Sequence, residues 1–175
     1  MTRDWRIRDK GHYGAPMLSR LSTPGRWAAV VALAATAVVP VTTAASAEAA
    51  PSAAAQNRYE AKVQKAMNAA RSDHERKKLK TDKCANHYAE AWARKISNRS
   101  IQHQDLGRIL AKCHAVRASE NIARGNVGSA KMVSLWMHSP GHKANLLDKK
   151  VTRVGVATVW SKGRYTAVTV FIKPA

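Results

Sequence analysis

A serine and a histidine stand three residues apart in the segment Trp136–Leu147, where Ser139 precedes Pro140. A hydroxyl this close to the imidazole of His142 could act as a nucleophile beside its base. Ser139 also has a simpler interpretation, because a serine directly before a proline is typical of a helix N-cap with proline at the first helical position. Neither capping nor packing requires an imidazole at 142. His142 is therefore a candidate ligand, base or hydrogen-bonding anchor.

Two helices are expected to position this segment. The apolar residues ahead of it recur at helical spacing: Val133, Trp136 and Met137. Pro140 cannot continue that helix, because its ring removes a backbone donor and clashes with the preceding turn. We therefore expect one helix to end near His138 and a short second helix to extend through Leu147, with His142 in its first turn.

Three motifs follow one another along the chain: Ser119-Glu120-Asn121-Ile122-Ala123-Arg124-Gly125, then Trp136-Met137-His138-Ser139-Pro140-Gly141-His142 with Asn145 and Leu147, then Val154-Gly155-Val156. Together they resemble the bacterial branch of the CAP superfamily, also called SCP or sperm-coating-protein-like domains. The resemblance covers roughly Tyr59 to Ile172, with Ser119 in place of the glycine of the family's Gly-Glu-Asn-Ile motif. It implies a secreted α/β domain, a three-layer α-β-α sandwich around a mainly antiparallel sheet.

Many members of that family have a cleft with two histidines and two glutamates. By resemblance, Glu120 corresponds to the glutamate of Gly-Glu-Asn-Ile, His142 to the second histidine and His103 to the first. The fourth position departs, since animal and plant relatives have a glutamate three residues after the tryptophan and this chain has Ser139 there. That difference puts in doubt any activity that requires both carboxylates.

The resemblance thus assigns these residues to a cleft: His103, Glu120, Ser139, His142 and Asn145. Two imidazoles and one carboxylate (His103, His142 and Glu120) suit Zn²⁺ or another divalent cation, with a fourth position left for water. His114, six residues before Glu120, is the alternative to His103. It is less favoured because it directly follows a cysteine.

Residues 1–47 have the features of a secretory signal peptide: a basic segment, the apolar run Trp27–Val41 and small residues after it. The run is shorter than the roughly 20 residues of a membrane-spanning helix, so a retained anchor is the less favoured alternative. Met17 is an alternative translation start. Residues 48–57 are expected to be a disordered lead-in, and residues 58–175 a single, monomeric CAP/SCP domain.

The chain is strongly basic, with 30 Lys and Arg against 11 Asp and Glu. Without residues 1–47 there remain 24 against nine, a formal charge of +15. Such a field attracts anionic partners, which outside a cell include lipid headgroups and anionic envelope polymers. The alternative is that the charge only keeps the domain soluble. The basic residues are spread along the chain without a nucleic-acid-binding motif, so a specific nucleic acid is not expected.

Two amphipathic helices and two strands are expected to build the sandwich. The first helix presents an apolar face of Tyr59, Val63, Ala66, Met67 and Ala70 and ends at about Glu75. The second, capped by Thr81 or Asp82, presents Ala85, Tyr88, Ala89, Trp92 and Ile96. The strands, 154–160 and 165–172, are joined by the turn 161–163. Both of their faces are largely apolar, which favours a sheet buried between helical layers.

Cys84 and Cys113 are the only cysteines. Export would place them in an oxidising compartment, so we expect a disulfide between them. It would tie the second helix to the segment that leads into Glu120.

These features predict an extracellular binding or interaction module with a His/Glu cleft, a bound divalent metal, and a lipid or cell-envelope ligand. The alternative is a metal-dependent hydrolase that uses the same cleft, because a metal-bound water can be a nucleophile at neutral pH. The H-E-x-x-H helix of zinc proteases is absent, and a second carboxylate is missing. Binding is therefore favoured over catalysis.

Overall fold

The computed structural model describes residues 49–175. Its elements are, in chain order, α1 (Ala53–Asp73), β1 (Lys80–Thr81), α2 (Lys83–Ile96), α3 (Leu106–Lys112), β2 (Ala115–Gly125), α4 (Ser129–Met137), α5 (Pro140–Leu146), β3 (Arg153–Ser161) and β4 (Arg164–Pro174). The expected signal peptide of residues 1–47 and the alternative start at Met17 lie outside the described residues. Within residues 49–175, no helix combines the length and the apolar character needed to cross a membrane.

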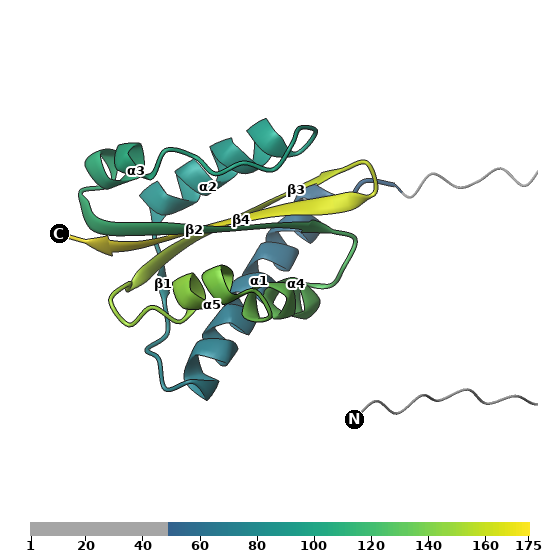
Figure 1. The fold of residues 1–175 in the computed structure, drawn as a ribbon. Coiled ribbons are helices and arrows are strands. Elements are labelled where there is room, and N and C mark those ends of the chain that lie inside the picture. The colour runs from purple at the N-terminus through teal and green to yellow at the C-terminus, as the bar shows by residue number, and fades with distance from the viewer. Residues whose placement is uncertain (1–48) are drawn as a thin grey trace, which may run out of the picture. The chain divides into compact units, whose positions relative to one another are not determined.

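Four strands form one sheet in the order β1-β3-β4-β2. β1 pairs parallel with β3, and the other two pairs are antiparallel. Helices α2 and α3 lie on one side of the sheet, and α1, α4 and α5 lie on the other (Figure 1). The expected α-β-α sandwich with a mainly antiparallel sheet is confirmed.

The hairpin of β3 and β4 supplies the buried centre of the sheet. The residues from 166 to 172 of β4 are all buried, because helices cover both faces of the strand. Val168 and Val170 pack on the side of α2, whereas Ala167 and Phe171 pack on the side of α1. The turn that joins the strands needs left-handed backbone, with φ of 72° at Gly163. Both strands and their turn were predicted from the sequence.

Helix α2 lies unusually close to the sheet. Its N-cap is Asp82, whose Oδ1 accepts a hydrogen bond from Ala85 N at 3.0 Å. Small residues face the sheet at Ala85, Ala89 and Ala93, all fully buried. A Cβ on Gly155 would lie 2.2 Å from the backbone of Ala85, so only glycine fits in β3 at that position. This explains the glycine in Val154-Gly155-Val156.

Helix α1 covers the opposite face of the sheet. It starts at Ala53, with Ser52 as its N-cap, so residues 53–57 are helical where a disordered lead-in was expected. Its buried residues are Val63, Met67 and Arg71, and the core on this side also includes Met132, Trp136, Leu146 and Phe171. The apolar face predicted for α1 is correct, but the buried guanidinium of Arg71 was not expected.

The sequence analysis did not identify strand β2 or helix α3. β2 includes Arg117, Ser119, Glu120 and Asn121 within its 11 residues, so it lacks the apolar alternation by which strands are recognised. It forms only because it pairs antiparallel with β4, with Glu120 opposite Val170. Since β2 is an edge strand, polar side chains can leave the sheet there without disturbing the core.

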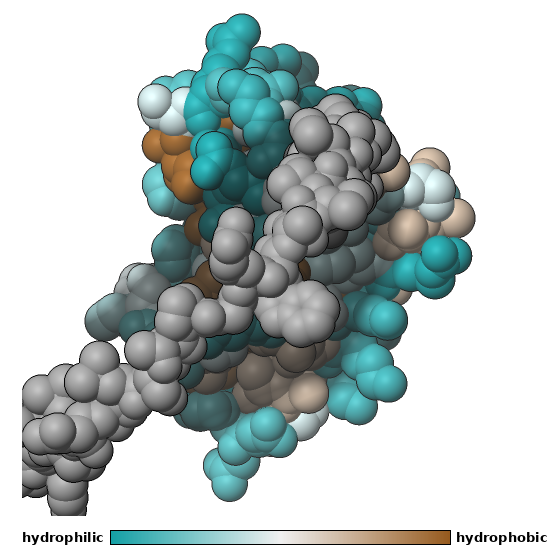
Figure 2. Space-filling view, turned by 90° about the vertical axis from the view of Figure 1, so that its right-hand side faces the viewer, coloured by the Kyte–Doolittle hydropathy of each residue, from teal (hydrophilic) through white to brown (hydrophobic). Residues whose placement is uncertain are grey.

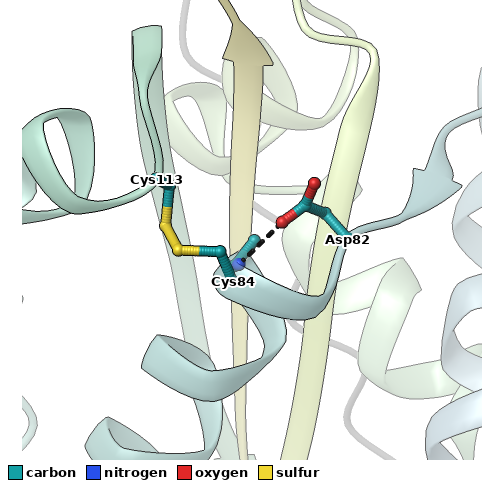
Figure 3. The surroundings of a disulfide bond; sticks show 4 residues. Asp82, Cys84 and Cys113 are labelled. Atoms are coloured by element: carbon teal, nitrogen blue, oxygen red, sulfur yellow. Dashed lines mark hydrogen bonds between the residues drawn. A yellow bond between two sulfur atoms is a disulfide. The ribbon is translucent and has the colours of Figure 1, made fainter.

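The expected disulfide is present. Cys84, in the first turn of α2, bonds Cys113 at the end of α3 with a Cα–Cα distance of 5.6 Å. Figure 3 shows the bond next to the Asp82 cap of α2. The cap and the disulfide together anchor the start of α2 and the chain entering β2.

The surface of the described domain is mainly polar. The large hydrophobic side chains that are exposed lie on separate elements, Ile101 in a loop, Val116 on β2 and Leu135 on α4. Figure 2 shows one end of the molecule, where hydrophilic residues occupy most of the visible rim.

Candidate functional site

A cavity of about 510 Å³ opens at the edge of the sheet, beside β2. Its lining residues are His103, Leu106, Ser119, Glu120, Ser139, Gly141, His142, Ala144 and Asn145. The structure thus brings together all five residues assigned to the cleft. They come from three segments, which approach from both helical layers around the edge strand. His114, the alternative to His103, is not part of this lining.

Glu120 is the buried charge of the cleft, with a side chain that is 1% exposed. His103 Nδ1 lies 2.7 Å from Glu120 Oε1. Gln104 donates twice, from its backbone N to Oε1 at 3.3 Å and from its side-chain Nε2 to Oε2. A buried carboxylate is unfavourable unless it is hydrogen-bonded, so these contacts explain how β2 accommodates an acid. They also hold the loop at 103–104 against the strand.

The contact with Glu120 determines the orientation of His103. An ionised carboxylate only accepts hydrogen bonds, so the proton is on Nδ1 and Nε2 is left as the acceptor or ligand atom. The His103 side chain is 59% exposed, which leaves this nitrogen accessible. A histidine oriented by a carboxylate in this way is typical of metal-binding imidazoles.

His142 lies in the first turn of α5, where the sequence predicted it. Its imidazole is half-buried and lines the cleft. Burial lowers the pKa of His142, and the proximity of His103 lowers this pKa further. The neutral form of His142 is therefore favoured, which is the form that can bind a metal ion.

Two asparagines connect the cleft's strand to its helix. Asn145 Nδ2, on α5, donates to Glu120 O and to Asn121 Oδ1, both at 3.1 Å. Asn121 Nδ2 donates to His142 O at 2.9 Å. We call Asn121 and Asn145 the asparagine clamp. It fixes the backbone of both Glu120 and His142, so Asn145 serves the cleft as a positioning residue.

Ser139 occupies the N-cap position of α5, with Pro140 at the start of the helix as expected. The expectation that its hydroxyl caps the helix is wrong, because its side chain makes no cap hydrogen bond. It lines the cleft instead. Ser119, at the position where the family motif has glycine, also reaches the cleft, and its buried Oγ has no hydrogen-bond partner.

The expected three-ligand metal site is not assembled. Among residues 49–175, no group of three or more His, Cys, Asp or Glu side chains is arranged to hold a metal ion. The physical reason is the position of Glu120, whose two oxygens accept hydrogen bonds from His103 and Gln104. Glu120 is placed to orient an imidazole, and the two histidines remain as candidate ligands.

Sequence reasoning missed two residues that shape the cleft, Gln104 and Asn121. Each stands next to a residue that was selected, Gln104 after His103 and Asn121 after Glu120. Adjacency was the only signal in both cases. For Asn121 the reason is that neighbouring residues in a strand point to opposite faces, and nothing in the local sequence shows that both faces of β2 meet the cleft.

A family model described as the cysteine-rich secretory protein family, CAP, matches residues 64–172. The chain belongs to this family. The resemblance recognised from the motifs around Glu120, His142 and Gly155 is thereby confirmed. All of the cleft residues lie within the matched range.

Two bacterial relatives support this assignment. The uncharacterized protein YkwD of Bacillus subtilis (strain 168) is 30% identical over 117 residues, which is 62% of this chain and 45% of YkwD. An extracellular protein containing an SCP domain from Bacillus anthracis str. Ames has a similar structure, with a TM-score of 0.60 and 26% identity over 67% of this chain and 41% of its own. The chain spans less than half the length of either relative.

The same fold occurs in a solved structure described as NaASP2 with Zn²⁺. Its TM-score is 0.54 at 12% identity, over 70% of this chain and 83% of its own. At that identity the likeness shows a common fold alone.

Proposed function

We propose that this protein is a secreted binding module whose cleft holds a small ligand together with a divalent cation at His103 and His142. The contact of His103 Nδ1 with the buried Glu120 is the observation that supports this most strongly. It orients an exposed imidazole with its other nitrogen available, beside a second imidazole that favours the neutral form.

The residues fit a cation bound by imidazole nitrogen. Glu120 would accept the hydrogen bond of His103 on the side away from the cation, raising the basicity of His103 and fixing its ring. A cation such as Zn²⁺ would supply a positive, Lewis-acidic centre for an anionic or carbonyl group of the ligand. The asparagine clamp would keep the backbone of Glu120 and His142 in place while the ligand exchanges.

The rest of the lining combines a mainly apolar wall with a few polar side chains. Leu106 is the only large aliphatic side chain in it. The Ser139 hydroxyl, which makes no cap hydrogen bond, lines the cleft and is available to a ligand. Small-molecule sites commonly combine a few such convergent polar groups with a concave wall.

Secretion is part of the proposal. The disulfide between Cys84 and Cys113 is typical of oxidising compartments. The relative from Bacillus anthracis is described as extracellular. Both agree with the export signal predicted in residues 1–47.

We propose binding and not hydrolysis. Glu120 is the only acidic residue in the cleft lining, and both of its oxygens already accept hydrogen bonds. No further described carboxylate is positioned there as a general base. The hydrolase alternative has no specific observation in its favour.

Calorimetric titration of zinc into the purified protein tests the proposal. His103→Ala and His142→Ala should each abolish most of the affinity, and Glu120→Gln should weaken it by about 10- to 100-fold, as expected for a carboxylate behind a ligand. His87→Ala is the matched control, since His87 is exposed and outside the cleft lining. Affinity should also fall at acid pH, because a protonated imidazole cannot bind a metal ion. Zinc binding no tighter than that of the His103→Ala/His142→Ala double variant would reject the metal site.

A further inference from the structure

A second cavity, of about 310 Å³, lies between the loop that joins α1 to β1 and the loop that joins α5 to β3. Figure 1 draws both loops at the same end of the molecule. Five of its lining side chains are basic: Lys77, Lys78, Lys80, Lys149 and Arg153. We call these five residues the basic pocket. Val151 and Thr152 complete the described lining, which therefore contains no acid.

The two loops are held together by a buried arginine. Arg71, 1% exposed, donates from Nε to Lys77 O at 2.8 Å in one loop. In the other loop, the same guanidinium donates to Leu146 O at 2.7 Å and to Asp148 O at 3.0 Å. The positions from which the lysines project are thus fixed by the core of the protein.

The remaining basic residues are fixed by the sheet. Lys80 pairs with Arg153 in the parallel β1–β3 ladder, and Lys80 N donates to Thr152 O at 3.1 Å. The side chain of Asn68, on α1, holds the backbone of Leu79. Its Oδ1 accepts a hydrogen bond from Leu79 N at 2.8 Å, and its Nδ2 donates to Leu79 O at 3.1 Å. The basic pocket is accordingly a concave site on a rigid frame.

No described carboxylate lies within salt-bridge distance of the five residues. Asp148 directly precedes Lys149, but its carboxylate contacts the Arg117 side chain and the backbone N of Lys150. The positive charges of the basic pocket are therefore uncompensated by acids in the described part of the chain.

Such clustering works against folding, because like charges repel in the compact state. Solubility alone does not require it, since a net charge dispersed over the surface serves that purpose equally well. A rigid cavity that gathers five cations is better explained by an anionic ligand that neutralises them.

The chemistry of the cluster indicates the kind of anion. Four of the five residues are lysines, whose ammonium groups bind phosphate as flexible point charges and can follow a chain of anionic groups. One phosphate monoester has a charge of only about −1.5 to −2 at neutral pH, too little to balance five cations. Several phosphates in a row would do so. Val151, the apolar residue of the described lining, is itself buried.

We propose that the basic pocket binds a linear polyanion with repeating phosphate groups, such as a phosphodiester polymer of the cell envelope. This site is separate from the His/Glu cleft and does not depend on the metal site. It would attach the domain to a polymer while leaving the cleft accessible to its own ligand.

The test compares two triple variants that remove the same charge. The pocket variant removes three of the five positive charges of the basic pocket, through Lys78→Gln, Lys80→Gln and Lys149→Gln. The α1 variant removes three exposed positive charges of α1 that do not line the pocket, through Arg58→Gln, Lys62→Gln and Lys65→Gln. Binding of fluorescent short-chain inorganic polyphosphate is followed by anisotropy over a salt series. Circular dichroism and thermal unfolding show that each variant is folded.

We expect the pocket variant to lose at least about tenfold in polyphosphate affinity at low salt, and the α1 variant less than about threefold. The plot of log affinity against log salt has a negative slope, and its magnitude should decrease by about 2 in the pocket variant alone. Each lost phosphate contact decreases that magnitude by about 0.7. Equal losses in both variants would overturn the site in favour of diffuse attraction. Wild-type protein that binds phosphatidylglycerol vesicles but not polyphosphate would overturn the polymer in favour of a membrane surface. No binding to either would also overturn the proposal.

Discussion

Two buried charges, Glu120 and Arg71, are stabilised in opposite ways. Arg71 donates its hydrogen bonds to three backbone carbonyls, which belong to loops on the two sides of it. Glu120 accepts its hydrogen bonds from the loop at 103–104, and one donor is a histidine side chain that is 59% exposed. Both residues are almost fully inaccessible to solvent.

Under the proposed function, the difference separates a structural charge from one that serves the cleft. Backbone carbonyls cannot rotate away without unfolding the loops, so Arg71 makes the fold and the frame of the basic pocket rigid. An exposed imidazole can exchange its partners more easily, so in the proposed function Glu120 orients a group that remains accessible to a ligand. A buried charge therefore indicates function only when one of its partners is accessible.

The largest effect is expected at Arg71. Arg71→Met keeps most of the buried stem but leaves the carbonyls of Lys77, Leu146 and Asp148 without their donor. We expect a loss of about 3–5 kcal/mol in the free energy of unfolding, measured by urea denaturation. Arg76→Met is the matched control, because Arg76 is only half-buried and has one close contact, to Leu147 O at 3.1 Å. It should lose about 1 kcal/mol. Equal losses would show that burial of the guanidinium is not what matters.

A smaller effect is expected at the asparagine clamp. Asn145→Ala removes two hydrogen bonds that link α5 to β2 and should lower the free energy of unfolding by about 1–3 kcal/mol. Zinc affinity should fall as well, because Glu120 and His142 lose their common anchor. Ser139→Ala is the control within the same cleft, and it should cost less than about 0.5 kcal/mol since its hydroxyl makes no cap bond. A stable Asn145→Ala variant with unchanged zinc affinity would contradict the clamp.

The smallest effect concerns the pH dependence of the cleft. Burial, with a further contribution from His103, lowers the pKa of His142 below its ordinary value near 6.5. As pH falls through about 6.5, the unfolded chain takes up a proton at this position before the folded chain does, so stability decreases. An NMR titration of the His142 ring should show the lowered pKa, and His103→Gln should raise it part of the way back. His142→Gln should remove this component of the pH dependence of unfolding. A His142 that titrates at or above 6.5 in the wild type would contradict the prediction.

Local physical chemistry was sufficient for several features of this protein. Pro140 divides α4 from α5 because its ring is incompatible with a continuous helix, and this places His142 in a first turn wherever the pair of helices packs. The apolar runs of β3 and β4 can only be buried on both faces, which determined the layered fold. Two cysteines in one small domain left a single pairing, between Cys84 and Cys113. These outcomes depend on neighbouring residues or on composition.

Tertiary structure alone decided the rest. β2 has too many polar residues to be recognised as a strand, and it exists because β4 offers an unpaired edge. Gln104 and Asn121 become part of the cleft only once that edge strand brings two helical layers together around Glu120. Arg71 lies on the apolar side of α1 because carbonyls of two distant loops receive its hydrogen bonds, and the same loops assemble the basic pocket. Each of these depends on hydrogen bonds between residues far apart in the chain, and such partners leave no local pattern in the sequence.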